Sequence, residues 1–207
     1  MARALMTGLL FAVALLPTAI MAKESKQERQ VRELLSLSPE TLISRIDISN
    51  DPLDPSITIS TKGVIALTSK GLLSSATNEN SFLRGFIDKK TGEVSVQIYH
   101  LAIYSARGWH FFERATYEAP DGLREVETTR AGSDVSCSKY GCTHYEDIIV
   151  PIDFDVLTQA AANYDPAAPM LGLRYRLFAK SGEKIDDALP INEIVAFVRV
   201  MESSRPR

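Results

Sequence analysis

The spacing of apolar residues predicts two helices near the start of the chain. Residues 25–37 place a few apolar side chains at helical spacing among many charged ones, which predicts a weakly amphipathic helix. A second helix is predicted to begin at Ser38, a residue type preferred as a helix cap, with Pro39 at the first helical position. The prolines within residues 51–55 end this helix, because proline disrupts regular backbone hydrogen bonding.

From Ile57 onward, apolar and polar residues alternate, which is the period of half-buried strands. Turn sequences separate these stretches, and the clearest is Pro-Asp-Gly at residues 120–122. The predicted strands begin at Ile57 and continue as residues 82–88, 93–104, 109–118, 123–130, 144–152 and 171–179. A short helix is predicted over residues 154–163, and a last helix over residues 190–201 carries its apolar residues on one face.

This order of elements predicts the α+β class. We expect a mainly antiparallel sheet, a meander of about six to eight strands, with the C-terminal helix packed on it. The chain has no internal repeat and no interior linker. We therefore expect a signal peptide at residues 1–22, an N-terminal helical segment at residues 23–56 and a single antiparallel domain at residues 57–207.

The first 22 residues have the layout of a secretory signal peptide. Arg3 supplies a positive start, residues 5–16 are almost entirely apolar, and Pro17 and the small residue Ala22 follow. We therefore expect cleavage near Ala22 and a periplasmic or secreted protein. The alternative is an uncleaved membrane anchor, since the apolar stretch is almost long enough to span a bilayer.

Cys137 and Cys142 are the only two cysteines, separated by four residues. In an exported protein, cysteines this close most simply form a local disulfide, and Gly141 helps the chain turn between them. A redox-active pair would favour two intervening residues, and a zinc site would need more ligands nearby. We therefore predict a structural disulfide that contributes about 2 kcal/mol by chain entropy.

The composition excludes several classes of protein. With 45% hydrophobic and 24% charged residues, the chain resembles a folded protein rather than a disordered one. A formal net charge of −3 without a basic tract gives no electrostatic basis for binding nucleic acid. A single long apolar run, at the N-terminus, excludes a polytopic membrane protein.

Histidines are the first candidates for catalysis. If Tyr104 pairs with Trp109 across the short turn between them, His100 lies opposite Glu113, and the two could form an acid–base pair. His110 would then point to the other face from His100, so these two histidines could not share a metal.

A second polar cluster covers residues 144–147. On a strand, His144 and Glu146 share one face, while Tyr145 and Asp147 share the other. A zinc site needs at least a third protein ligand, which no motif supplies. We therefore interpret the cluster as the solvated face of a strand.

No motif points to a cofactor, a metal or a defined reaction. The chain lacks a phosphate-binding loop, a dinucleotide glycine motif and a Gly-x-Ser-x-Gly elbow. The most unusual local composition is aromatic, and most of it fits sheet packing. Aromatic residues also dominate ligand pockets and interfaces. The candidate binding surface therefore consists of Tyr99, Tyr104, Trp109, Phe111 and Arg114.

Together these patterns predict an exported, non-enzymatic binding or interaction protein. One form would carry an apolar small molecule in a cavity between sheet and helix. The other would dock on a protein of the cell envelope, through a sheet edge or through the charged helix after the signal peptide. The alternative is a periplasmic hydrolase that uses His100 or His144 as base, with Glu113 or Asp147 as partner.

Overall fold

The computed structural model describes residues 35–62, 64, 80–167 and 171–206. The predicted signal peptide at residues 1–22 and nearly all of the helix predicted at residues 25–37 lie outside this part. Among the described residues, no helix combines the length and the apolar character needed to cross a bilayer.

The described strands form two antiparallel sheets, which confirms the α+β class. The larger sheet has six strands in the order β1-β2-β3-β4-β8-β7. Its members are β1 (Asp47–Ser49), β2 (Ser56–Ser60), β3 (Asn80–Asp88), β4 (Val94–Ser105), β7 (Thr129–Ser138) and β8 (Gly141–Ile152). The smaller sheet has four strands in the order β10-β9-β5-β6. Its members are β5 (Phe112–Ala119), β6 (Gly122–Glu127), β9 (Leu171–Ala179) and β10 (Lys184–Pro190).

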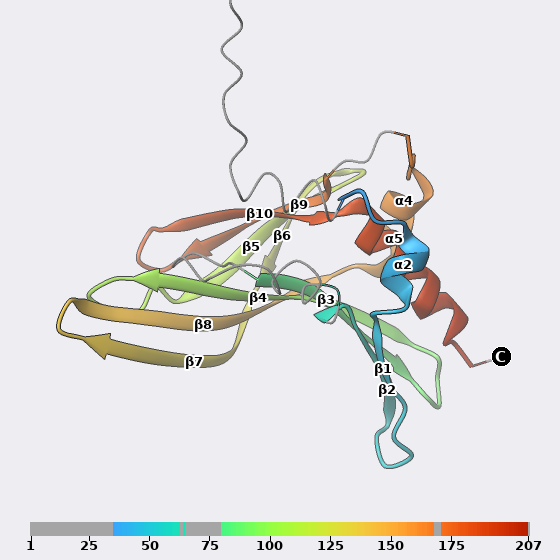
Figure 1. The fold of residues 1–207 in the computed structure, drawn as a ribbon, viewed down its shortest axis with the longest axis horizontal. Coiled ribbons are helices and arrows are strands. Elements are labelled where there is room, and N and C mark those ends of the chain that lie inside the picture. Colours follow the sequence, from blue (N-terminus) through green and yellow to red (C-terminus); the bar gives the residue numbers. More distant parts are fainter. Residues whose placement is uncertain (1–34, 63, 65–79, 168–170, 207) are drawn as a thin grey trace, which may run out of the picture.

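The helices of the described part of the chain gather at one end of the two sheets (Figure 1). They are α2 (Pro39–Ile43), α4 (Phe154–Ala162) and α5 (Ile191–Ser203). The predicted start of α2 is confirmed: Pro39 is its first residue, and the Ser38 hydroxyl accepts a hydrogen bond from the Thr41 amide at 3.3 Å. Both α2 and α4 pack against α5, which also contacts both sheets, as predicted for the C-terminal helix.

Apolar side chains of both sheets and of α5 form one continuous core. Two glycines let α5 approach the strands closely. A Cβ added at Gly172 of β9 would lie 2.9 Å from the backbone Cα of Ile191, and one added at Gly85 of β3 would lie 2.5 Å from the Met201 sulfur. A larger residue at either position would therefore push the helix or its side chains away from the sheets.

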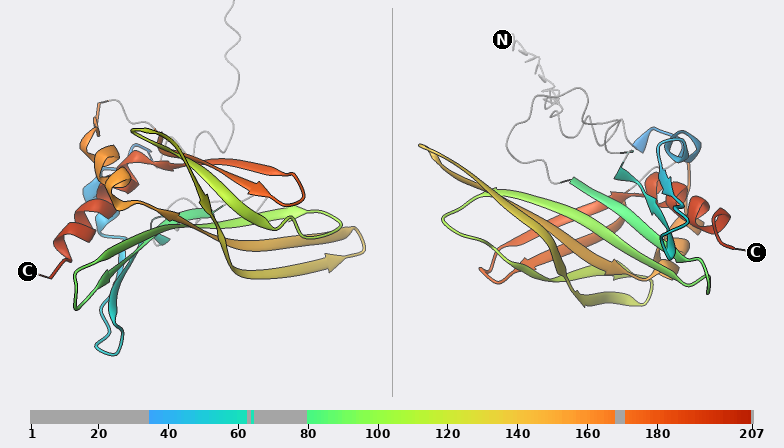
Figure 2. Two further views of the ribbon diagram at one scale, coloured as in Figure 1. Left: turned by 180° about the vertical axis from the view of Figure 1, so that it is seen from behind. Right: turned by 90° about the horizontal axis from the view of Figure 1, so that it is seen from below.

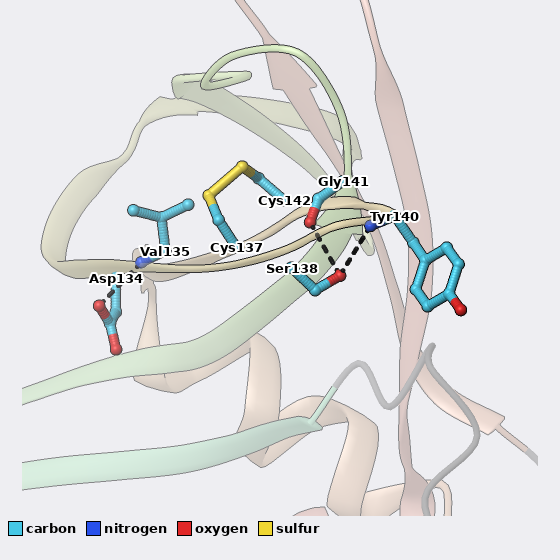
Figure 3. The surroundings of a disulfide bond; sticks show 7 residues. All are labelled: Asp134, Val135, Cys137, Ser138, Tyr140, Gly141 and Cys142. Atoms are coloured by element: carbon cyan, nitrogen blue, oxygen red, sulfur yellow. Dashed lines mark hydrogen bonds between the residues drawn. A yellow bond between two sulfur atoms is a disulfide. The ribbon is translucent and has the colours of Figure 1, made fainter.

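The β7–β8 hairpin extends from the end of the molecule opposite the helices (Figures 1 and 2). Near its tip, Cys137 and Cys142 face each other across the two strands and form the predicted disulfide. The disulfide and Val135 lie on the same side of the hairpin, and Tyr140 points away from them (Figure 3). Tyr140 is 87% exposed, so the tip makes little contact with the rest of the described chain.

The chain changes sheets where the sequence predicts one continuous strand, at residues 123–130. β6 ends at Glu127 in the smaller sheet, and β7 begins at Thr129 in the larger one. Thr128 fixes this corner: its amide donates to the Glu113 carbonyl at 3.0 Å, and its hydroxyl donates to the Phe112 carbonyl at 2.8 Å. The alternation continues through the corner, so it could not reveal the change of sheet.

The predicted pairing of Tyr104 with Trp109 is wrong. β4 pairs with β3 and β8, whereas β5 begins only at Phe112 and belongs to the other sheet. The segment between them therefore passes from one sheet to the other instead of closing a hairpin. Three stretches of strand were not predicted: β1, residues 131–138 of β7, and β10 with its two adjacent aspartates. β1 lies where the helix that begins at Ser38 was predicted to continue, but α2 ends at Ile43.

Candidate functional site

The predicted binding surface does not form one patch. Tyr99 lies on the face of β4 opposite His100 and stacks on Phe82, with 5.0 Å between ring centroids. Arg114 lies on the exposed face of the smaller sheet, where it pairs with Glu125 at 2.8 Å. These two residues thus belong to different sheets.

The remaining three members, Tyr104, Trp109 and Phe111, gather near the buried carboxylate of Glu146. Glu146 Oε1 accepts hydrogen bonds from the Tyr104 hydroxyl and from the backbone amides of His110 and Phe111, both at 3.1 Å. Phe111 has a left-handed φ of 55°, which turns these two consecutive amides toward the carboxylate. The cluster thus holds the crossing between the sheets in place and has a structural role.

His144 and Glu146 are buried, so the prediction of a solvated strand face is wrong. His144 stacks on Tyr104 and meets the edge of the Trp109 ring at 4.8 Å between centroids. Asp147, its predicted catalytic partner, lies on the other face of β8. Burial, followed by the hydrogen bond to Glu146, raises the pKa of Tyr104.

His100 is fully buried between the sheets and does not meet Glu113, its predicted partner. Its Nδ1 lies 2.8 Å from the Tyr175 hydroxyl and 3.4 Å from Asp187 Oδ2. Asp187 also accepts hydrogen bonds from Tyr175 at 2.7 Å and from Ser81 at 2.8 Å. Burial alone would raise the pKa of Asp187, but the contacts with His100 and Tyr175 outweigh it and lower the pKa. This network joins the two sheets.

Neither histidine cluster offers a metal centre: the described ranges hold no group of three or more His, Cys, Asp or Glu side chains placed to bind an ion. Glu113, proposed as a catalytic partner, lies on the surface and faces Lys180 at 3.6 Å. His100 meets titratable neighbours, yet its complete burial separates it from solvent.

A groove of about 530 Å³ opens at one edge of the space between the sheets. This volume is in the range of ligand-binding clefts, roughly 300–1,000 Å³. Both sheets and the start of α4 contribute to its walls. The lining residues are Val94, Ser95, Val96, Tyr117, Arg124, Glu125, Val126, Pro151, Ile152, Asp153 and Phe154.

Two strand edges border this groove. Within the described part of the chain, neither edge has a pairing partner on the groove side. β6 pairs with β5 alone and forms the edge of the smaller sheet. The pairing of β7 with β8 ends at Thr129 and Ile149, so residues 150–152 of β8 pair only with β4. Unpaired backbone amides and carbonyls of this kind are the groups to which an added strand binds.

The polar part of the groove is built around Arg124. Its guanidinium donates to Asp153, and its Nη2 donates to both oxygens of Asp121, at 3.2 and 3.0 Å. The Tyr117 hydroxyl also donates to Asp153, at 3.4 Å. Arg124 therefore links β6 to the start of α4, and its hydrogen bonds lower the pKa of Asp121.

A second, smaller groove of about 220 Å³ lies over the four-stranded sheet. Its exposed charges are paired across neighbouring strands: Arg174 meets Glu118 at 3.1 Å, and Arg176 donates to Asp186 at 2.9 Å. This pattern of paired charges is typical of a solvated sheet face.

The larger groove was not predicted from the sequence, because its walls come from four separate stretches of the chain. One signal was nevertheless available. Pro151 falls inside a predicted strand, and proline in a strand marks an edge, since it cannot donate to the ladder.

No protein-family model matches the chain, and the comparisons with curated proteins and with solved structures found no match either.

Proposed function

We propose that this protein is an exported, non-enzymatic binding module that takes an extended polypeptide segment into the groove between β6 and the end of β8. The observation that carries the proposal is the unpaired edge of β6, which borders a groove whose walls hold both apolar and charged side chains. Addition of a strand to an open sheet edge is a common mode of peptide recognition.

The groove suits the two requirements of strand addition. Backbone groups along the free edge of β6 supply hydrogen bonds that do not depend on the bound sequence. Apolar side chains below them receive every second side chain of the segment. The apolar positions are Val94, Val96, Val126, Ile152 and Phe154.

β7, the longest edge strand, is less suited to docking. Its ladder is interrupted by a bulge between Arg130 and Gly132. Bulges are devices by which proteins prevent strand addition. The register of β6 with β5 has no such interruption.

The structure also favours a polypeptide segment over an enclosed apolar cargo. Side chains from both sheets fill the space between them, including Ile98, Ile148 and Leu177. The groove lies at the rim of this core. An extended segment needs only an open groove of this kind, whereas a carrier needs an enclosed apolar cavity.

Export is supported by two features. The first 22 residues carry the signal-peptide pattern, and Cys137 and Cys142 form a disulfide of the kind that persists in oxidising compartments.

Fluorescence anisotropy with a defined peptide tests the proposal. The probe is a labelled seven-residue peptide of alternating threonine and valine with blocked ends. We expect saturable binding that is lost in Val126→Lys, which blocks the groove, and retained in Leu123→Lys. Leu123 is 75% exposed and lies on the opposite face of the same strand, so it is the matched control.

A second probe, with alternate amides N-methylated, keeps the side chains but loses backbone donors along one edge. The proposal requires at least tenfold weaker binding of this probe to the unaltered protein. Equal binding of both probes would overturn strand addition even if Val126→Lys failed to fold, and thermal melting identifies that failure.

A further inference from the structure

We infer that the bound segment carries a basic residue, which it presents to the end of the groove formed by Asp153 and Phe154. This inference rests on the proposed function and names the chemical class of the segment. Two independent observations support it. The cation Arg124 in the groove is already paired with carboxylates, and the guanidinium group of Arg205 already lies on the ring of Phe154.

Arg124, the cation among the described lining residues, is engaged by carboxylates. Arg124 donates to Asp153 with one terminal nitrogen and to both oxygens of Asp121 with the other. An anionic ligand would therefore have to replace carboxylates already in place. The groove does not favour an acidic segment.

The carboxylates keep capacity to accept further hydrogen bonds. The contacts of Asp153 with Arg124 and Tyr117 both reach Oδ2, and its side chain remains 60% exposed. A carboxylate can accept about four hydrogen bonds, so Asp153 can receive a donor from a ligand as well. The positive end of the α4 dipole does not reverse this preference, because Asp153 precedes the helix and Asp155 occupies its first turn.

The ring of Phe154, which belongs to the groove lining, already packs against a guanidinium group. Arg205, which follows α5, lies over the Phe154 ring with 5.2 Å between Cζ and the ring centroid. Arg205 is exposed, and Phe154 belongs to the lining of the groove. The ring face and the adjacent carboxylate thus form a site for a cation, which a basic residue of the segment would take over from Arg205.

The experiment compares peptides that differ at one position. The threonine–valine peptide is made with arginine, glutamine or glutamate at its first or its last residue. We expect arginine at one of the two ends to bind about three- to fivefold more tightly than glutamine, and glutamate to bind more weakly than glutamine. Raising the salt concentration to about 0.5 M should reduce this preference, since exposed charges are then screened.

Variants of the protein sharpen the test. Asp153→Asn should reduce the arginine-to-glutamine preference to near one, while Asp186→Asn, which alters an ion-paired carboxylate on the other groove, should keep it. Arg205→Ala should increase the preference, because the competing guanidinium is removed.

The two proposals fail in different ways. If the uncharged peptide binds but arginine gives no preference at either end, the inference about the basic residue is overturned and the proposed function stands. If arginine is preferred equally in Asp153→Asn and Arg205→Ala, the cation lies elsewhere and the inference is also overturned. If no peptide of any charge binds, both proposals fail.

Discussion

The two ends of the molecule are stabilised by different means (Figure 1). At one end, ten residues of α5 are buried between the sheets and the other helices. At the other, β7 has no buried residue and is held by its backbone ladder with β8 and by the disulfide between Cys137 and Cys142.

This difference indicates where substitutions should change the free energy of unfolding most. Burial of apolar surface supplies most of the stability of a domain, so the α5 end should dominate the free energy of unfolding. β7 and the tip of the hairpin should tolerate changes with small, local effects. The groove includes the start of α4, which packs against α5.

The largest expected effect contrasts one aromatic residue from each end. Phe197 in α5 is fully buried, and Phe197→Ala should lower the free energy of unfolding by about 4 kcal/mol through the lost contacts and the cavity. Tyr140 is 87% exposed, and Tyr140→Ala should change it by less than about 0.5 kcal/mol. Urea unfolding measures the free energy of unfolding of both variants. If the two variants lost similar amounts of free energy, the proposed difference between the two ends would be wrong.

A smaller effect, within the buried end, depends on pH. Glu193 of α5 is buried, and its carboxyl accepts a hydrogen bond from Thr61 at 2.5 Å. Burial raises the pKa of Glu193 from 4.5 to about 7, although the hydrogen bond from Thr61 acts in the opposite direction. The folded protein therefore binds this proton more tightly than the unfolded chain does.

The stability contributed by this proton is complete below pH 4.5 and is lost as the pH rises through about 7. The loss should be on the order of 3 kcal/mol. Urea unfolding from pH 4 to 8 measures this loss: the free energy of unfolding should fall as the pH rises in the unaltered protein, and this fall should be absent in Glu193→Gln. If the free energy of both proteins changed equally with pH, Glu193 would not be the source of the change.

The smallest of the three effects concerns the disulfide. Replacing both cysteines by serine, in Cys137→Ser with Cys142→Ser, should lower the free energy of unfolding by about 2 kcal/mol, because the closed loop is short. The fold should persist, as judged by circular dichroism. Loss of the folded state would mean that the hairpin organises the core. In the unaltered protein, thiol reagents should label neither cysteine before reduction.

Elements with a clear period could be predicted from the sequence. α5 and strands such as β4 and β9 have apolar residues that repeat at 3.6 or at two, and these are the residues that face the core. The disulfide was also predictable, because the two cysteines are close in sequence and the N-terminus has a signal-peptide pattern.

The burial of polar residues that face inward could not be predicted. In β10, Asp187 turns inward to accept hydrogen bonds from Ser81 and Tyr175, which lie 106 and 12 residues away. Glu146 is likewise buried because backbone amides 35 and 36 residues away reach it. Such partners come from the tertiary fold, so a hydrophobic pattern treats these residues as exposed.

The groove could not be predicted for the same reason, because its residues are brought together only by the tertiary fold. Val94, Val126 and Phe154 meet there because the chain changes sheets at Thr128 and because β8 leads into α4. Neither event leaves a periodic signal. Only Pro151 indicated that a strand edge remains unpaired.

Hydrogen exchange of the backbone amides tests the central claim, strand addition at the groove, most directly. The threonine–valine peptide is added to the protein, and exchange is followed residue by residue. The account predicts slower exchange of alternate amides along the free edge of β6, with no change in β7. Unchanged exchange in β6 at saturating peptide, or protection confined to β7, would contradict it.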